Sequence, residues 1–295
     1  MERTFAFLGP RGTNTEEAAR LIFREEHDIF RPYRTIPDCL EAAAAGKVDY
    51  AVVPWENSLE GSVNLTLDWI IHKIDLPILS ELIIPISHQL VGARREQPLE
   101  LENVTRVLSH PQAIAQCHGF LRDHLAHAEI EYVSSTAEAA RLVSEHPEEP
   151  WVAISAMQAV QSYPVTLLHE SIEDADNNFT RFIVVGAEAL ALPKAEKHKT
   201  TILVTLPSDF PGALHQVLAA FSWRRLNLSR IESRPTKTGL GNYHFVIDIE
   251  QQMDDVLMPG AFAEMEALGC QVRFLGTYPI FIKQRNGAEL SVRPS

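Results

Sequence analysis

The stretch Thr180-Arg181-Phe182-Ile183-Val184-Val185-Gly186 sets a hydroxyl and a guanidinium at the start of a short apolar run, which is typical of a buried β-strand. A polar turn, residues 173–178, comes directly before it. Similar apolar runs recur through the first two thirds of the chain and alternate with segments of helical periodicity. The expected strands are 5–8, 49–54, 86–91, 104–108, 130–133, 151–154 and 181–185, and the expected helices are 13–25, 36–45, 111–121, 135–144 and 155–160. This alternation predicts an α/β fold with largely parallel strands.

Four of the expected helices begin with residues that favour a helix start. Three have the capping-box pattern of a hydroxyl followed three residues later by Glu or Gln, and a fourth has proline at its first position. These starts are at Thr13, Ser135, Ser155 and Pro111. In such folds, strand ends and helix N-termini meet at one edge, where unpaired amide N–H groups favour carboxylates. The pattern indicates an anion-binding cleft at this edge, or simply a set of well-capped helices.

The last third of the chain has a rhythm of its own. Residues 188–199 contain a proline and mixed charge and are expected to form a linker. Strands are then expected at 201–206, 228–233, 243–249 and 271–275, helices at 212–223 and 260–268, and a turn at 239–241. The order βαββαβ is that of a ferredoxin-like α+β domain.

Composition limits the possible functions. The chain has 295 residues, enough for about two domains, and its net charge of −13 argues against nucleic acid and anionic membranes as partners. A dianionic substrate would need a positive field built locally. Three scattered cysteines and twelve histidines without ligand spacing predict neither disulfides nor a metal site. Without a secretory signal or a long apolar run, we expect a cytoplasmic protein.

Three further segments strengthen the reading of the Thr180 stretch. They are residues 53–63, which contain Glu56 and Asn57, residues 109–117, and residues 232–235. In this order, and together with Thr180-Arg181-Phe182, the segments resemble those of the prephenate dehydratase family over nearly the whole chain. That family joins a catalytic domain to an ACT domain that senses phenylalanine.

The resemblance implies a domain plan. A bilobal, periplasmic-binding-protein-like α/β catalytic domain is expected over 1–187, with 84–152 as its inserted lobe. The linker 188–199, a ferredoxin-like ACT domain at 200–281 and a C-terminal tail at 282–295 follow. No fused chorismate mutase is expected.

The resemblance also implies an activity. Such an enzyme expels the ring hydroxyl and carbon dioxide from prephenate to leave phenylpyruvate, needs no cofactor, and is inhibited by L-phenylalanine. A homodimer or homotetramer is expected, because ACT domains usually bind their ligand at a subunit interface. Two alternatives stay open: an arogenate dehydratase, which performs the same chemistry on the aminated substrate, and a non-catalytic amino-acid sensor.

The family match assigns catalytic roles by position. The residues so assigned are Thr180, Glu56, Asn57, Gln116 and Ser109. Thr180 is expected to donate a hydrogen bond to the leaving oxygen; the alternative is a strand-start threonine that bonds its own backbone. Glu56 is either protonated, and so a proton source, or it orients Asn57 and Thr180.

Substrate contacts are expected from Arg181, Phe182, Thr13 and Thr15. Arg181 either binds a carboxylate with two parallel bonds or forms a surface salt bridge with the acidic turn at 174–176. The glycine loop at 8–15 departs from the family pattern, with an asparagine at position 14 where an aromatic residue is usual.

Two short segments of the ACT domain are expected to hold phenylalanine. The residues are Gly212, Ala213, Leu214, Glu232, Ser233, Arg234 and Pro235. Small residues at the helix start would let an amino acid's carboxylate approach free amide N–H groups. Arg234 has an alternative role as a partner of Glu232 or of an acid on a neighbouring subunit. His215 stands where the family more often has an apolar residue.

Overall fold

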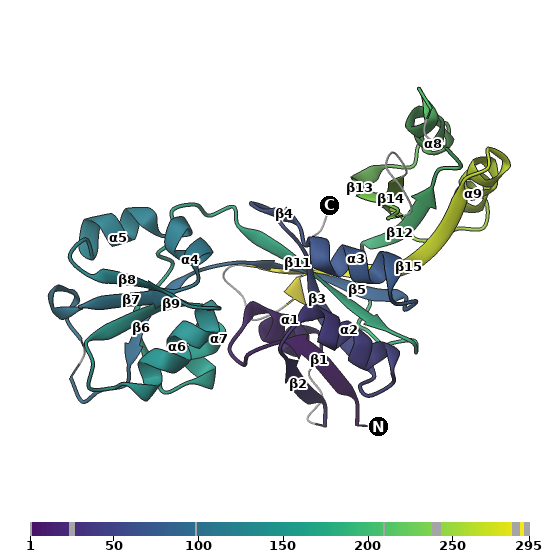
Figure 1. Cartoon of the computed structure of the whole chain (residues 1–295). Coiled ribbons are helices and arrows are strands. Elements are labelled where there is room, and N and C mark those ends of the chain that lie inside the picture. The colour runs from purple at the N-terminus through teal and green to yellow at the C-terminus, as the bar shows by residue number, and fades with distance from the viewer. Residues whose placement is uncertain are drawn as a thin grey trace.

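The computed structural model describes residues 2–23, 27–97, 99–208, 210–237, 243–284 and 290–291. Figure 1 shows two lobes and a third, smaller domain, with long strands that run between them. We name them the first lobe, the second lobe and the ACT domain. None of the described helices is long and apolar enough to cross a membrane. The α/β fold with a separate α+β domain is confirmed.

The first lobe is built around one end of a large mixed sheet. Its strands are β1 (Thr4–Leu8), β2 (Ile29–Tyr33), β3 (Tyr50–Asn57), β4 (Gly61–Ser62), β5 (Ile78–Pro85) and β11 (Phe179–Gly186). Its helices are α1 (Asn14–Ile22), α2 (Ile36–Ala44) and α3 (Asn64–His72). The order is β5-β11-β3-β1-β2, and β11 runs antiparallel to both β3 and β5. One face of the sheet packs on α2 and α3 and the other on α1, so β11 is covered on both sides.

The second lobe has its own sheet, in the order β10-β6-β9-β7-β8. Its strands are β6 (Gln89–Ala93), β7 (Arg106–Ser109), β8 (Glu129–Tyr132), β9 (Trp151–Ser155) and β10 (Val165–His169). Its helices are η1 (Leu101–Asn103), α4 (Pro111–Gln116), α5 (His118–His124), α6 (Thr136–Glu145) and α7 (Met157–Ser162). The expected end of this lobe at residue 152 is wrong, because β9 and β10 both belong to its sheet.

Two segments connect the lobes, and we call them the hinge segments: residues 86–88, after β5, and residues 170–178, before β11. They lie side by side, because Ile86 N–H donates to the Asn178 carbonyl at 2.9 Å and Ile172 N–H donates to the His88 carbonyl at 2.9 Å. The polar turn recognised in the sequence is thus one of two paths between the lobes.

The ACT domain has the expected βαββαβ order. Its elements are β12 (His198–Thr205), α8 (Ala213–Ser222), β13 (Leu228–Pro235), β14 (Tyr243–Ile249), α9 (Leu257–Ala267) and β15 (Gln271–Lys283). One sheet face packs on α8 and α9, and the other on the α3 side of the first lobe. The turn predicted at 239–241 lies outside the described residues.

Strand β15 continues from the ACT sheet into the catalytic sheet. Its first part pairs with β12, and residues 280–282 pair with β5 in parallel, so the two domains share one continuous sheet. At the crossing, a Cβ on Gly276 would collide with the carbonyl oxygen of Ile78, which explains the glycine. The expected tail from 282 therefore still contains the end of β15, followed by β16 (Leu290–Ser291), which pairs with it.

The helix starts agree with the sequence in part. Thr13 and Ser135 cap α1 and α6 as expected, accepting from the N–H groups of Glu16 and Glu138. The cap predicted at Ser155 is wrong: α7 begins two residues later, and the Ser155 hydroxyl donates to the Thr136 carbonyl. The helix expected at 111–121 is two helices that break at Cys117.

Candidate active site

A cleft of about 310 Å³ lies where the two lobes and the hinge segments meet. Most of its lining residues are polar, and Glu60 is the one carboxylate among the described lining residues. The lining residues are Asn14, Pro54, Asn57, Glu60, Val63, Ile86, His88, His110, Gln112, Ala113, Gln116, Ser134, Ser135, Thr136, Asn178 and Thr180. The sequence predictions Thr180, Asn57 and Gln116 are thus brought together, from three separate parts of the chain.

Thr180 and Asn57 face each other across neighbouring strands. They are register partners on β11 and β3, and Asn57 Nδ2 donates to Thr180 Oγ1 at 2.9 Å. Asn57 Oδ1 accepts from the backbone N–H groups of Leu59 at 2.9 Å and Glu60 at 3.2 Å, which fixes the orientation of the amide. Because the Thr180 oxygen accepts, its hydroxyl hydrogen is left to donate into the cleft.

A chain of amides extends this pair across the cleft. Asn57 Nδ2 also donates to Asn178 Oδ1 at 2.8 Å, and Asn178 Nδ2 donates to Gln116 Oε1 at 3.0 Å. The same Gln116 oxygen lies 2.7 Å from His88 Nε2. An amide oxygen can only accept, so His88 carries its proton on Nε2. The donors therefore converge on Gln116 Oε1 from Asn178 on one side and His88 on the other, and this leaves the Gln116 NH₂ group as a donor for a ligand.

His88 is a neutral end to this chain. Burial lowers its pKa, against the opposing effects of the Gln116 hydrogen bond and the Glu173 carboxylate. The Glu173 carboxylate accepts from the His88 backbone N–H at 2.8 Å, which holds the first hinge segment to the second. His88, Asn178 and Gln116 thus link both hinge segments to the second lobe.

A β-bulge decides which way Glu56 points. Arg181 pairs with Glu56 but Phe182 pairs with Pro54, so Trp55 is an extra residue in β3. Trp55 and Glu56 therefore share the face away from the cleft, whereas Asn57 returns to the face of Thr180. The expected place of Glu56 beside Thr180 is not what the structure shows, because the bulge reverses the alternation of the strand at this point.

Arg181 faces away from the cleft together with Glu56. Its guanidinium donates to Glu56 at 2.5 Å, to Glu81 at 2.6 Å and to Asp248 of the ACT domain at 2.7 Å. The salt bridge expected with the acidic turn is therefore wrong, and the Arg181 side chain does not line the cleft. Burial disfavours the charge, but Glu81 and Asp248 outweigh it and raise the arginine pKa.

Four other predicted residues serve the fold in this structure. Phe182 is buried in the core under α1, and Ser109 donates to the Ile154 carbonyl at 2.7 Å. Thr13 donates to the Leu8 carbonyl and caps α1, and Thr15 is buried. None of the four side chains lines the described cleft.

Helix N-termini provide the positive field of the cleft. The first residue of α1, Asn14, and the cap of α6, Ser135, both line it, so the N-terminal ends of these helices face the same space. Among the described lining residues there is no lysine or arginine. Glu60 at the rim has a pKa raised by burial, against a smaller opposite effect of His110.

Sequence reasoning missed Asn178, His88 and Asn14. Asn178 stands in the polar turn before Thr180, two residues away along a strand, and this spacing places both side chains on one face. His88 and Asn14 gave no comparable signal, because their place in the cleft depends on how the lobes meet.

The predicted effector residues divide into two groups. Gly212 begins α8 in the left-handed conformation, Ala213 is buried and Leu214 packs on the ACT core. Glu232 and Arg234 instead reach the first lobe: Glu232 accepts from Ser62, and Arg234 donates to Asn64 and Asp68 on α3. Arg234 thus pairs with Asp68 and not with Glu232, as one expected alternative had it. Ser233 and Pro235 are exposed.

Taken together, fold and site define a two-lobed α/β enzyme whose cleft suits a small anion, joined to an ACT domain. A family model described as prephenate dehydratase matches residues 5–190, and one described as ACT domain matches residues 200–258. The chain belongs to the prephenate dehydratase family.

Individual relatives agree over almost the full length. A prephenate dehydratase of Bacillus subtilis is 48% identical over 281 residues, covering 92% of this chain and 97% of the relative. The crystal structure of a prephenate dehydratase from Arthrobacter aurescens in complex with L-Phe has a TM-score of 0.83 and 38% identity, covering 94% of this chain and 89% of that one. A structure described as a novel type of quorum-quenching acylase has a TM-score of 0.80 and 26% identity, covering 94% and 98%.

Proposed function

We propose that this chain is a prephenate dehydratase that converts prephenate to phenylpyruvate and is inhibited by L-phenylalanine. The observation that carries the proposal is the oriented Asn57–Thr180 pair in a cleft between two lobes, in a chain that belongs to this family. The B. subtilis relative and the L-Phe complex of the A. aurescens enzyme support both halves of the statement.

The reaction needs little covalent help from the protein. The bond from the ring carbon to the carboxylate breaks and releases carbon dioxide, its electron pair completes the aromatic ring, and the hydroxyl on the opposite ring carbon leaves with a proton as water. Thr180 is placed to donate its hydrogen to that hydroxyl, because its own oxygen already accepts from Asn57. A water in the open cleft would restore the proton.

The neutral lining suits this chemistry. One of the two substrate carboxylates is lost as carbon dioxide, so a cation bound tightly to it would stabilise the ground state more than the transition state. Helix N-termini at Asn14 and Ser135, with the Gln116 amide, offer hydrogen-bond donors without a full charge. This revises the expected substrate contacts: we assign them to these groups rather than to Arg181, Phe182, Thr13 and Thr15.

Acylase chemistry has less support in this cleft. A hydroxyl nucleophile needs a base within hydrogen-bond reach. Thr180 Oγ1 bonds an amide donor, and the His88 Nε2 proton is directed to Gln116. In the described cleft, Thr180 is thus placed as a proton donor, which a dehydration requires, and not as a nucleophile activated by a base.

The remaining assignments concern the whole protein. The effector would bind at the start of α8, at Gly212, Ala213 and Leu214, with Ser233 and Pro235 on β13 available beside it. We also propose a homodimer or homotetramer in the cytoplasm, which the family resemblance supports. We propose a domain plan with a catalytic domain at 1–187, a linker that ends where β12 begins at His198, an ACT domain that runs to the end of β15 at Lys283, and an inserted lobe extended to the end of β10.

The test is a phenylpyruvate assay with purified protein and prephenate, run with and without L-phenylalanine. Turnover that phenylalanine suppresses supports both domains' roles. Turnover on arogenate that exceeds turnover on prephenate would replace the substrate. Saturable binding of prephenate without any turnover would support the sensor alternative and remove the proposed activity.

A further inference from the structure

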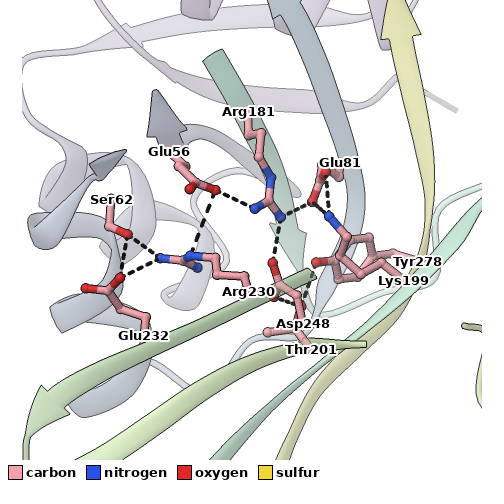
Figure 2. A network of polar contacts seen from close by, with 10 residues as sticks. All are labelled: Glu56, Ser62, Glu81, Arg181, Lys199, Thr201, Arg230, Glu232, Asp248 and Tyr278. Atoms are coloured by element: carbon pink, nitrogen blue, oxygen red, sulfur yellow. Dashed lines mark hydrogen bonds and ion pairs between the residues drawn. The ribbon is translucent and has the colours of Figure 1, made fainter. Parts of the chain in front are cut away.

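The face of β11 opposite the cleft carries a buried set of polar residues that crosses between domains. We call it the inter-domain network, and Figure 2 shows its members converging from both sides. It consists of Glu56, Ser62, Glu81 and Arg181 of the first lobe, Lys199 at the start of β12, and Thr201, Arg230, Glu232, Asp248 and Tyr278 of the ACT domain. None of these residues lines the described cleft, yet two of them are the chain neighbours of Thr180 and Asn57.

One half of the network holds Arg181 in place through both of its Nη atoms, although Arg181 Nε has no hydrogen-bond partner among the described residues. Its Nη2 is shared by Glu81 and by Asp248, whose other oxygen accepts from Thr201 at 2.8 Å. Lys199 donates to Glu81 at 3.0 Å. Burial opposes ionisation of Asp248, but the charges of Arg181, Lys199 and Arg230 outweigh it and lower its pKa. This half therefore fixes β11 to the ACT sheet.

The other half is incompletely satisfied, at Arg230. Its side chain is only 6% exposed, yet Nε and Nη1 have no hydrogen-bond partner among the described residues. Its Nη2 donates to Ser62 at 2.7 Å. Buried guanidinium nitrogens without partners are unfavourable and are rare in native proteins. Arg230 thus has unused bonding capacity at the contact between domains.

Two carboxylates lie near Arg230: Glu232 Oε2 is 3.9 Å from its Nη2, and Glu56 faces its unpaired Nε. Arg230 Nε lies 3.9 Å from Glu56 Oε2, the same oxygen to which Arg181 donates at 2.5 Å. Figure 2 shows Glu56 between the two guanidinium groups, one from each domain. A shift of about 1 Å would bring Arg230 into hydrogen-bond range. Glu56 therefore has two competing partners, and only one is fully engaged.

Arg230 also contacts the rest of the bulge that orients Asn57. Its guanidinium lies over the Trp55 ring at 4.9 Å from the centroid, and Ser62 is the cross-strand partner of Glu56 on β4. Beside it, Glu232 accepts from the same Ser62 hydroxyl at 2.9 Å. Strand β13 thus contacts the β3–β4 hairpin at the bulge residues Trp55 and Glu56, and at Ser62 on the opposite strand. Glu56 is the chain neighbour of Asn57.

We propose that Glu56 is a positioning residue through which the ACT domain controls the Asn57–Thr180 pair. When phenylalanine is bound, Arg230 takes Glu56 from Arg181, shifts the bulge and misplaces Asn57. The inference rests on the proposed function, since it names how that site is regulated. It also gives Glu56 a role other than proton donation.

The test uses Arg230→Gln in the full chain, with prephenate turnover and direct phenylalanine binding measured by calorimetry. Arg230 does not line the cleft, and its described contact with the predicted effector residues is the one to Glu232 at 3.9 Å, so turnover without phenylalanine is expected to stay within about twofold. The phenylalanine concentration for half inhibition is expected to rise at least about tenfold, within the usual range of allosteric coupling, while binding persists. Arg230→Lys keeps the charge on a single nitrogen. Its phenylalanine concentration for half inhibition is expected to lie between those of the wild type and Arg230→Gln.

Two further variants make the test specific. Arg273→Gln removes another ACT arginine at the domain contact, which donates to the Ile70 carbonyl on α3 rather than to the β3–β4 hairpin. It should leave inhibition unchanged. Glu56→Gln is expected to lower turnover and inhibition together, and adding Arg230→Gln to it should change inhibition no further.

The outcomes separate the two levels of the argument. If the wild-type protein turns over prephenate and is inhibited, but Arg230→Gln is inhibited equally, only the coupling through Glu56 is overturned. The same holds if Arg273→Gln loses inhibition as fully as Arg230→Gln, because general loosening of the contact would then explain both. A wild-type protein without turnover, or without any response to phenylalanine, overturns the proposed function and this inference with it.

Discussion

The two faces of strand β11 differ in kind although their residues are neighbours in the chain. Thr180 faces a cleft lined by amides, hydroxyls and helix N-termini, whereas Arg181 faces a buried network of full charges. The face that lines the cleft would use neutral groups of the protein to bind a charged molecule. The opposite face uses charges that neutralise one another within the protein.

This difference separates two tasks. Neutral donors can orient a dianion without binding its ground state much more strongly than the transition state. They depend on hydrogen-bond direction, and the fixed Asn57 amide supplies that direction. Removing one partner of a buried ion pair costs much stability, because the other charge stays buried without a partner. Such pairs are therefore sensitive to displacements between domains. We therefore expect changes on the first face to affect turnover, and changes on the second to affect stability and regulation.

The sharpest way to break this comparison is Thr180→Ala. Loss of the hydroxyl is expected to reduce kcat by about 10²- to 10⁴-fold, the usual contribution of a positioned proton donor. Thr180→Ser keeps the hydroxyl and should retain most activity. Both are measured by phenylpyruvate formation, with an unchanged urea unfolding curve as the folding control. Near-normal turnover in a folded Thr180→Ala protein would remove the assigned role.

On the other face, Arg181→Met is expected to act mainly on stability. It leaves Glu81 and Asp248 buried without their shared partner, and breaking such a buried pair costs about 3–5 kcal/mol. Urea unfolding measures the change in the free energy of unfolding. An Arg106→Met control removes an arginine whose pairs with Glu129 and Glu131 are more exposed, and should cost much less. Equal losses would contradict the buried network.

Asn178→Asp tests the direction of the amide chain. A carboxylate at this position still accepts from Asn57 but cannot donate to Gln116, which loses one of its two donors. We expect kcat/KM to fall about 5- to 150-fold, which corresponds to about 1–3 kcal/mol for an unmet buried polar group. The matched control is Asn177→Asp, which adds the same charge at an exposed neighbour. If both variants behave alike, charge rather than direction is responsible.

The smallest effect is expected from His88, through pH. Its pKa is lowered in the folded protein from an ordinary value of 6.5, so the unfolded chain binds the proton first as pH falls. Stability should therefore be full above pH 6.5 and decrease as pH drops toward the folded pKa. In His88→Gln, this loss between about pH 7.5 and pH 5.5 should be smaller than in the wild-type protein. An identical pH profile for both proteins would refute a neutral, buried His88.

Much of the fold could be predicted from local sequence. The βαββαβ order, the caps at Thr13 and Ser135, and the strand that begins near Thr180 all depend on residues close together in the chain. The bulge at Trp55 could not be predicted, because it depends on how β3 pairs with β11. Its consequence is that Trp55 and Glu56 share the face away from the cleft, which returns Asn57 to the face of Thr180.

The candidate site was predictable where family segments supplied its residues. Thr180, Asn57 and Gln116 do meet in one cleft. Arg181 and Glu232 could not be placed correctly, because each has its partners in the other domain, and no local pattern indicates how two domains pack. His88 and Asn178 join the site only through the hinge segments.

Strand β15 has a consequence for how the enzyme can be altered. Residues 280–282 complete the catalytic sheet beside β5, so deleting the ACT domain would also leave β5 as an open edge with unpaired backbone groups. Such edges promote aggregation. The sensor is therefore also a structural part of the enzyme it regulates. A version insensitive to feedback should come from single substitutions at the domain contact, and not from truncation.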